Sequence, residues 1–443
     1  MRTIWWGAAR AAAPIGAAAA MACGGPKVPA SPVGDGFGAP VVVSQATANG
    51  ATPMFLVSPA GDRVLSWVSA PDGGEAGRLH VQVTPARGTA AAPVELVDPL
   101  GPIEPHGEAP PQLLADRQGH LYALYAVGKT IPGARFPVSA LRLVRSEDGG
   151  RTWQPPVTVN EHGQHGDFGS HNFHALGLGN DGALWATWLE NQRGRSSVVF
   201  TRSVDGGRTW APTRALNTEE ACPCCRTAIV AGTGNELFVA WRSVAAGDVR
   251  DIVVARSPDG GATWEAPVKP RDEGWVFPGC PHAGPSIKVD AEGRVHIAWW
   301  TGKPGEAGVW YGVSADRGRT WQAQAIATGA TSQPAHVQLA IAPGGQVAVA
   351  WDDGLSASPR ILLRRSRDGG IAFAATETVS GKGAAQYPVL ATVGDSLLVA
   401  WRQLTLEAHR KELAARADMR DPRAVMGLPR VGQSEIWLRG GRL

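Results

Sequence analysis

The amino-acid sequence predicts an all-β fold, a seven-bladed β-propeller in which seven four-stranded sheets surround a central channel. Two internal repeats support this prediction. One is an eight-residue turn that occurs five times, and the other is an apolar strand, ending in an aromatic residue, that occurs seven times. Repetition at a period of about 50 residues is typical of propellers, whose blades each bury both faces against their neighbours.

The five turns share an Asp at the third position and, in four copies, a Trp at the eighth. They read SEDGGRTW at 146–153, SVDGGRTW at 203–210, SPDGGATW at 257–264, SADRGRTW at 314–321 and SRDGGIAF at 366–373. Each lies between two short alternating runs, as a hairpin turn does. The Asp carboxylate can accept hydrogen bonds from the amides of the turn, and the Trp can cover it. We therefore predict a structural role for Asp148, Asp205, Asp259, Asp316 and Asp368.

The strands that end in an aromatic residue give the number of blades. Their last residues are separated by 50 to 63 positions and are Trp67, Tyr125, Trp188, Trp241, Trp299, Trp351 and Trp401. The seventh unit has a third strand at 434–438 and then lacks a fourth, whereas 39–44 reads like a fourth strand. We predict that 39–44 completes the last blade, which would leave no free sheet edge there. A six-bladed ring is the alternative.

One insertion interrupts the repeat. Residues 404–421 are rich in helix-forming residues and end before Pro422, so we predict a helix between the second and third strands of the last blade. This helix either covers the mouth of the channel as a lid or is a surface addition without a role at the mouth.

The N-terminal segment has the pattern of an export signal. Arg2 and Arg10 precede an apolar run at 11–22, and Ala-Met-Ala stands before Cys23. We predict a signal peptide at 1–22, a flexible tether at 23–38, lipidation of Cys23 and a propeller at 39–443. The protein would then be a lipoprotein of the periplasm or outer membrane, held to the membrane through its lipid alone. Plain secretion with Cys23 unmodified is the alternative.

The charge pattern argues against nucleic-acid binding. The formal net charge is only +3, and the 42 Lys and Arg residues form no basic cluster.

The repeated turn resembles the Asp box, or BNR repeat, of the sialidase-like β-propellers, and the resemblance extends over nearly all of the chain after residue 38. It implies the propeller fold and boxes on the face away from the ligand site. Many members of this family are not enzymes, so the boxes do not imply an activity.

Cysteine and histidine residues gather in the connections between blades, which should surround the channel mouth. The candidate metal ligands are Cys222, Cys224, Cys225, Cys280, His282 and His336. Cys222 and Cys280 stand at the same distance before the strand aromatic of their blades, and so do Cys224 and His282, so they should be neighbours.

Three interpretations of these residues are open. They could form disulfides, for example from Cys222 or Cys224 to Cys280, since an exported protein meets oxidising conditions. They could bind copper or zinc through soft thiolates, with imidazoles from 162–174 as further ligands. Cys224 and Cys225 could also form a redox-active pair. The segments ACPCCR and GCPHAGP resemble segments of uncharacterised bacterial sialidase-like propellers.

The resemblance also allows a comparison with sialidase chemistry. Enzymes of the family bind a carboxylate with three Arg, and use a Tyr nucleophile beside a Glu and an Asp acid/base. By this resemblance Tyr387, Arg226, Arg402 and Asp167 are candidates, but the first Arg is missing from 50–55, where GATPMF stands. Arg242 is a further Arg near the mouth, and the alternative carboxylates for the acid/base are Glu108, Glu190, Asp352 and Asp353.

We therefore expect a mouth that binds a metal, a small ligand or a protein partner. The rivals are an exo-sialidase-type glycoside hydrolase and a purely structural assembly factor.

Overall fold

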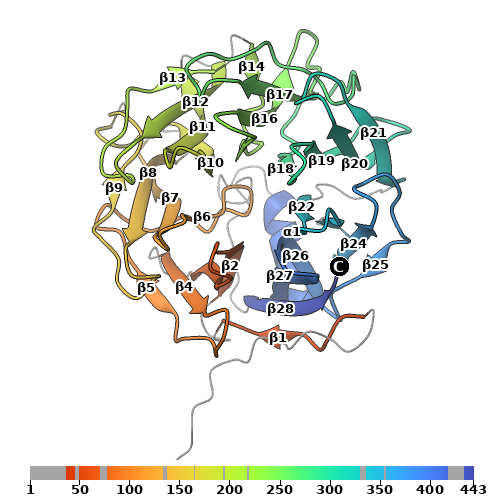
Figure 1. Ribbon diagram of the computed structural model, residues 1–443, viewed down its shortest axis with the longest axis horizontal. Coiled ribbons are helices and arrows are strands. Elements are labelled where there is room, and N and C mark those ends of the chain that lie inside the picture. Colours follow the sequence, from red (N-terminus) through yellow and green to blue (C-terminus); the bar gives the residue numbers. More distant parts are fainter. Residues whose placement is uncertain are drawn as a thin grey trace, which may run out of the picture.

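The computed structural model confirms the seven-bladed ring (Figure 1). It describes residues 36–44, 49–69, 77–132, 137–163, 165–192, 195–216, 219–329, 336–353, 356–417 and 434–443. Every blade is an antiparallel sheet of four strands, and the blades follow one another around the ring in chain order. The predicted signal peptide, Cys23 and most of the predicted tether lie outside the described residues.

The strands of each blade are given in chain order. Blade 1 consists of β2 (Gly50–Val57), β3 (Arg63–Ser69), β4 (Arg78–Thr84) and β5 (Val94–Leu96); blade 2 of β6 (Gln112–Ala115), β7 (Leu121–Lys129), β8 (Val138–Ser146) and β9 (Val157–Thr158); blade 3 of β10 (His171–Leu178), β11 (Leu184–Gln192), β12 (Arg195–Ser203) and β13 (Arg214–Ala215); blade 4 of β14 (Glu220–Ala221), β15 (Ala228–Ala231), β16 (Leu237–Val244) and β17 (Ile252–Ser257). Blade 5 consists of β18 (Ser286–Val289), β19 (Val295–Thr301), β20 (Gly308–Ser314) and β21 (Gln322–Thr328); blade 6 of β22 (Gln338–Ile341), β23 (Val347–Asp352), β24 (Ile361–Ser366) and β25 (Glu377–Thr378); blade 7 of β26 (Ala384–Val393), β27 (Ser396–Leu404), β28 (Ser434–Arg442) and β1 (Val41–Val42).

The two ends of the propeller meet in blade 7, as the sequence predicts. Val41 pairs with Leu438 and Val42 with Trp437, so β1 is the outermost strand beside β28. Backbone hydrogen bonds extend the contact on both sides, from Gly38 N to Gly440 O at 2.9 Å and from Val43 N to Ile436 O at 2.8 Å. This pairing closes the ring and removes a free sheet edge.

The Asp boxes form turns with one repeated hydrogen-bond pattern. In the first box Asp148 Oδ1 accepts from the amides of Arg151 and Thr152, and the Thr152 hydroxyl donates to Asp148 Oδ2 at 2.6 Å. The Ser146 hydroxyl oxygen accepts from Gly150 N. The carboxylates of Asp205, Asp259, Asp316 and Asp368 accept from their turns in the same way. These groups are fully used inside the turn, in agreement with a structural role.

The aromatic ends of the second strands form the core between the blades. All seven side chains are at most 4% exposed, from Trp67 to Trp401. The burial of these large aromatic rings stabilises the packing of each four-stranded sheet against its neighbours.

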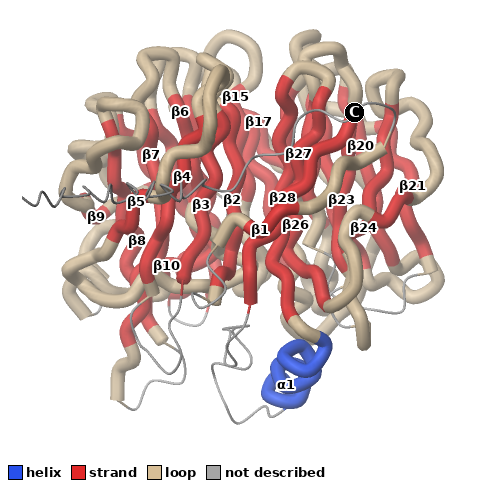
Figure 2. Tube along the Cα trace, turned by 90° about the horizontal axis from the view of Figure 1, so that it is seen from below, coloured by secondary structure: helices blue, strands red, loops and turns tan. Residues whose placement is uncertain are grey.

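Helix α1 (Leu406–Ala417) follows β27 and confirms the predicted helical insertion. Figure 2 shows that it lies beyond one end of the ring. Because the second strands end at this face while the Asp boxes follow the third strands, the helix and the boxes lie on opposite faces. The helix therefore marks the mouth face. None of the helices among the described residues has the length and apolar character needed to cross a membrane.

Candidate functional site: a buried cysteine cluster at the channel mouth

The cysteine motif lies in a break of the inner strand of blade 4. Ala221 pairs with Ser243 of β16, and Ala228 pairs with Ala240 of the same strand. Between these pairs β16 advances by three residues while the inner strand advances by seven, so residues 222–227 form an extra loop. Pro223 occupies the second position of a turn in which Cys225 N donates to Cys222 O at 3.4 Å. This turn is what brings the three cysteines together.

The three sulfur atoms form a compact buried group. Cys222 Sγ lies 3.6 Å from Cys224 Sγ and 3.4 Å from Cys225 Sγ, and all three sulfurs lie within 4.8 Å of one another. The three residues are at most 5% exposed. The structure holds them, and Cys280, as free thiols. Three sulfurs at this separation could all reach one soft metal ion.

Two guanidinium groups provide positive charge beside the cluster. Arg250 Nη1 donates to Cys222 Sγ at 3.2 Å, and the fully buried Arg242 lies close by, held by the carbonyl oxygens of Arg250, Ala283 and Trp300. Hydrogen bonds from the Cys224 and Cys225 thiols, and then these arginines, hold the pKa of Cys222 well below its usual value. Burial raises the pKa of the Cys224 and Cys225 thiols. The cluster thus favours one thiolate that accepts from two thiols.

Cys280 lies beside this cluster, as the sequence predicts, but on its solvent side. Its side chain is exposed, and its interaction with the neighbouring Cys224 thiol lowers the pKa of Cys280. His282, the other residue of the GCPH motif, has its Nδ1 3.0 Å from the Cys280 carbonyl oxygen. Of the candidate ligands, the structure groups the sulfurs of Cys222, Cys224 and Cys225, with Cys280 next to Cys224, whereas neither His282 nor His336 belongs to the three-sulfur group among the described residues.

A loop that the repeat does not explain crosses the ring at this face. We call residues 106–110, which precede β6, the hub segment (Figure 1). The His106 ring meets the Phe173 ring of blade 3 edge-on, and Ala109 packs in the same apolar cluster as Phe173 and the three cysteines. All five residues of the segment are buried. The hub segment therefore packs against the same apolar cluster as the sulfurs.

Glu108 of the hub segment joins three further blades. Its carboxylate lies 3.6 Å from Arg226 Nη1 and 3.3 Å from His336 Nε2, and it accepts from Gly284 N at 3.4 Å. Arg226 and His336 stand immediately before the inner strands of blades 4 and 6. Because Glu108 is only 2% exposed, these charged and polar partners replace the water that its carboxylate loses on burial.

Asp352 extends this network to Tyr387. His336 Nδ1 lies 2.7 Å from Asp352 Oδ2, and Tyr387 N donates to the same oxygen at 2.6 Å. The Tyr387 ring lies over the His336 ring, with 3.9 Å between centroids. A Cβ atom at Gly107 would come within 2.2 Å of the Tyr387 ring, so only glycine fits there. The predicted candidates Tyr387 and Arg226 thus meet in one buried network with Glu108, Asp352 and His336.

Tyr387 also has an unusual backbone conformation. Its φ is +54°, and the residues at the equivalent break in the inner strands of blades 1 and 3, Thr52 and Phe173, have φ of +51° and +59°. A positive φ strains a residue that is not glycine, and such strain is most frequent at functional sites. The inner strands are therefore bent where they reach the mouth.

Two other candidates have different surroundings. Arg402 is buried under α1, where its Nη2 and Nη1 lie 2.8 and 3.2 Å from the two carboxylate oxygens of Glu412. Asp167 lies 2.9 Å from the exposed His162 and 3.4 Å from the Thr158 hydroxyl. Neither residue contacts the Tyr387 network through a described interaction, so the four hydrolase candidates do not form one group.

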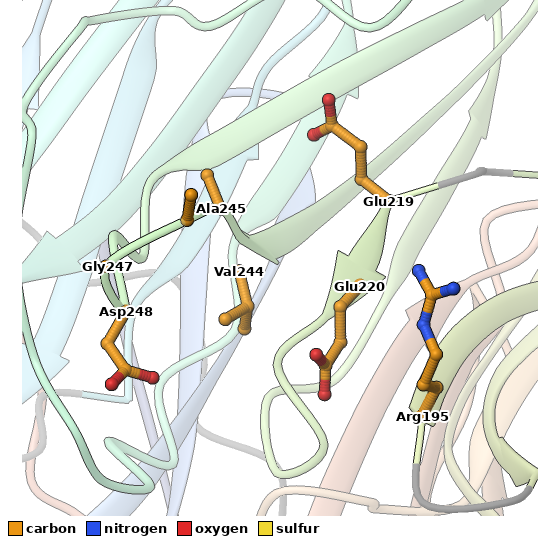
Figure 3. A pocket seen from close by; sticks show the side chains of 8 residues that line it. Arg195, Glu219, Glu220, Val244, Ala245, Gly247 and Asp248 are labelled. Atoms are coloured by element: carbon orange, nitrogen blue, oxygen red, sulfur yellow. The ribbon is translucent and has the colours of Figure 1, made fainter.

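An open cavity of about 540 Å³ adjoins the cysteine loop between blades 3 and 4 (Figure 3). Glu219 and Glu220 stand just before Cys222, and Asp248 forms an ion pair with Arg250 at 3.6 Å. With Arg195 on the opposite wall, the cavity is polar and mostly acidic.

Comparison with known proteins supports the fold. Residues 101–273 match the model of the BNR repeat-like domain. No curated protein matches the chain. A protein of unknown function from Dyadobacter fermentans has a similar structure, with a TM-score of 0.53, 15% identity and coverage of 91% of this chain and 98% of that one.

Two similar structures are enzymes. A PL25 ulvan lyase, solved with -[GlcA(1-4)Rha3S]-, has a TM-score of 0.53 at 15% identity and covers 80% of this chain and 92% of its own. The Hadza microbial sialidase Hz136 has a TM-score of 0.47 at 16% identity, with 85% and 76% covered. At these identities the likeness concerns the fold. The chain therefore contains a BNR repeat-like domain over residues 101–273 and folds as a seven-bladed β-propeller like these structures.

Proposed function

We propose that this protein binds a soft metal ion, Cu(I) or Zn(II), at the channel mouth through Cys222, Cys224 and Cys225. The observation that carries the proposal is the cluster of three buried sulfurs within 4.8 Å of one another. Thiolates are the ligands that both ions prefer, and Arg250 and Arg242 would offset the negative charge that three thiolates bring. Cu(I) suits a set of three sulfurs, whereas Zn(II) would take Cys280 as a fourth ligand.

The proposal includes export and anchoring. The signal-like segment before Cys23 supports a lipoprotein of the cell envelope, in which the propeller presents its mouth to the periplasm or the outside. The intact mass of the purified mature protein tests this part, because a lipid on Cys23 adds the mass of its acyl chains. A mature chain of unmodified mass would favour plain secretion.

Metal binding is tested by titration under anaerobic conditions. A Cys23→Ser chain, in which only the four propeller cysteines remain, should hold about one ion per chain in competition with a chelator. Cys225→Ser should weaken the affinity by roughly 100-fold or more, since it removes a ligand rather than a supporting group. Two disulfides in the freshly purified protein, with no bound metal, would contradict the proposal and support a structural role for the cysteines.

A second candidate, action on an acidic glycan, is favoured by the Tyr387 network. A buried Tyr with positive φ, stacked on a His between two carboxylates, is a group of residues suited to proton transfer. Fluorogenic sialosides and uronate-containing polysaccharides such as ulvan are the substrates to test. Turnover that is lost in Tyr387→Phe and kept in Cys225→Ser would establish this second function independently of the metal.

A further inference from the structure

Cys280 differs from the other three cysteines in its exposure. Cys222, Cys224 and Cys225 are buried, whereas Cys280 is exposed and belongs to a segment whose Ala283 N donates to Cys225 Sγ. Solvent therefore reaches the cluster on the side of Cys280. A molecule from solution that exchanges ligands with the buried sulfurs therefore meets the Cys280 thiol first.

The segment that carries Cys280 is fixed on both sides of it. On one side Arg250 Nε donates to the Phe277 carbonyl oxygen, and the same guanidinium donates to Cys222 Sγ. The Phe277 ring also stacks on Trp275 with 5.1 Å between centroids. On the other side Ala283 N donates to Cys225 Sγ at 3.5 Å. The segment of Cys280 is thus attached to Cys225 directly and to Cys222 through Arg250, and these two attachments fix Cys280 beside the cluster.

We propose that Cys280 receives a Cu(I) ion from a small thiolate complex in solution and passes it to the three buried sulfurs, the last donor thiolate leaving with the proton of the Cys225 thiol as Cys222 and Cys225 bind. This inference rests on the proposed metal-binding function and adds the route by which the ion arrives. A buried three-sulfur site needs such a route, because a donor complex cannot enter the space between Cys222, Cys224 and Cys225 itself. Exchange between thiolates depends on access to the attacking sulfur, and Cys280 has that access.

The transfer balances without a change of oxidation state. A Cu–S bond forms to Cys280 Sγ as one Cu–S bond of the donor breaks, and the released donor thiolate takes the proton that the Cys280 thiol gives up. A bond from copper to Cys224 Sγ then forms while the bond to Cys280 breaks, and the proton of the Cys224 thiol passes to Cys280. Copper remains Cu(I) throughout, and the buried sulfurs complete its coordination.

The test measures the rate of copper uptake separately from its extent. The Cu(I) complex of glutathione is mixed anaerobically with the full chain carrying Cys23→Ser, and with the same chain carrying Cys280→Ser as well. Both proteins should take up the same final amount of copper, about one ion per chain, but the Cys280→Ser protein should do so about tenfold more slowly or worse. Cys225→Ser is the matched control, in which the final amount itself should fall. Circular dichroism and the melting temperature of each variant confirm that it is folded.

Equal rates with and without Cys280 would overturn the inference. A Cys280→Ser protein that no longer retains copper would overturn it as well, because Cys280 would then be a permanent ligand of the site. If the chain with all four propeller cysteines binds no copper, the proposed function itself fails. The two failures are therefore distinct.

Discussion

Arg250 donates a hydrogen bond to the sulfur of Cys222 over 3.2 Å, and its other nitrogens contact the carbonyl oxygen of Phe277 and the carboxylate of Asp248. One guanidinium thereby joins the buried sulfurs, the segment that carries Cys280 and the wall of the acidic cavity. No other described side chain contacts all three.

Replacing Arg250 by Gln should weaken metal binding without preventing folding. The variant loses the positive charge beside Cys222, so the negative charge of a metal–thiolate complex is less well compensated. We expect the affinity for Cu(I) to fall by about 10- to 100-fold, the usual effect of removing a group that supports a metal ligand. Competition with a chelator measures it. Arg195→Gln, on the opposite wall of the cavity, is the control and should leave the affinity unchanged.

The pair of Arg402 and Glu412 should be needed to hold α1 on the mouth. Both side chains are buried, so Glu412→Gln leaves a guanidinium without its counter-charge and should lower the free energy of unfolding by about 3–5 kcal/mol. Denaturant unfolding measures this loss. The double variant Arg402→Met with Glu412→Leu removes both charges and should regain most of it. Equal loss in both variants would show that packing of the helix, and not the charge pair, matters.

His174 should make the protein less stable in mild acid. Burial lowers its pKa from 6.5 to about 4, so the folded protein keeps the imidazole neutral while the unfolded chain takes up a proton. Above pH 6.5 the imidazole is neutral in both states, and His174 does not make the free energy of unfolding depend on pH. As the pH falls from 6.5 to 4, protonation of the unfolded chain lowers the free energy of unfolding by about 3 kcal/mol.

The variant His174→Gln tests this dependence. The difference between its free energies of unfolding at pH 7 and pH 4 should be smaller than that of the unchanged protein. His162→Gln is the control, because the His162 side chain is 85% exposed and its loss should leave the pH dependence nearly the same. Identical pH profiles for the His174 variant and the unchanged protein would refute the assignment.

The outer strand of blade 7 should contribute measurably to stability. A chain that lacks residues 1–44 loses three hydrogen bonds to the backbone of β28, from Gly38 N, from Val43 N and to Ser44 Oγ, together with the pairing of Val41 and Val42 and the bonds from the Arg439 side chain to the carbonyl oxygens of Gly38 and Phe37. At about 1 kcal/mol each, the three bonds alone amount to about 3 kcal/mol. A chain that lacks only residues 1–35 is the matched control and should melt at the same temperature as the full chain. Equal melting of both truncated chains would contradict this role.

The sequence predicts the ring because its signals repeat. Each blade has one aromatic residue at the end of its second strand, such as Trp67 in blade 1. All seven are buried in the same way, so counting them gives seven blades. The equal offsets of Cys222 and Cys280 predict their proximity for the same reason. Propeller symmetry places equivalent positions of neighbouring blades side by side, and the structure indeed brings the segment of Cys280 to the cluster, where Ala283 N donates to Cys225 Sγ.

The parts that the sequence does not predict depend on segments outside the repeat. His336 is a candidate metal ligand by its position, but in the structure it lies between Glu108 and Asp352. Glu108 belongs to a loop before blade 2, and no periodic signal indicates that this loop reaches blades 4 to 6. In the same way, the position of Arg402 at a strand end predicts the mouth, yet only the folding of the insertion shows that Glu412 covers it.

The hub segment has a consequence for the order in which the protein folds. Glu108 meets Gly284 across 176 positions of the chain, and Val41 meets Leu438 only after the whole ring exists. Contacts of such long sequence separation form slowly, because much chain entropy is lost before they are made. Closure of the ring is therefore expected to be a slow step of folding, and the unpaired flank of an incomplete ring would be open to proteases and aggregation until it occurs.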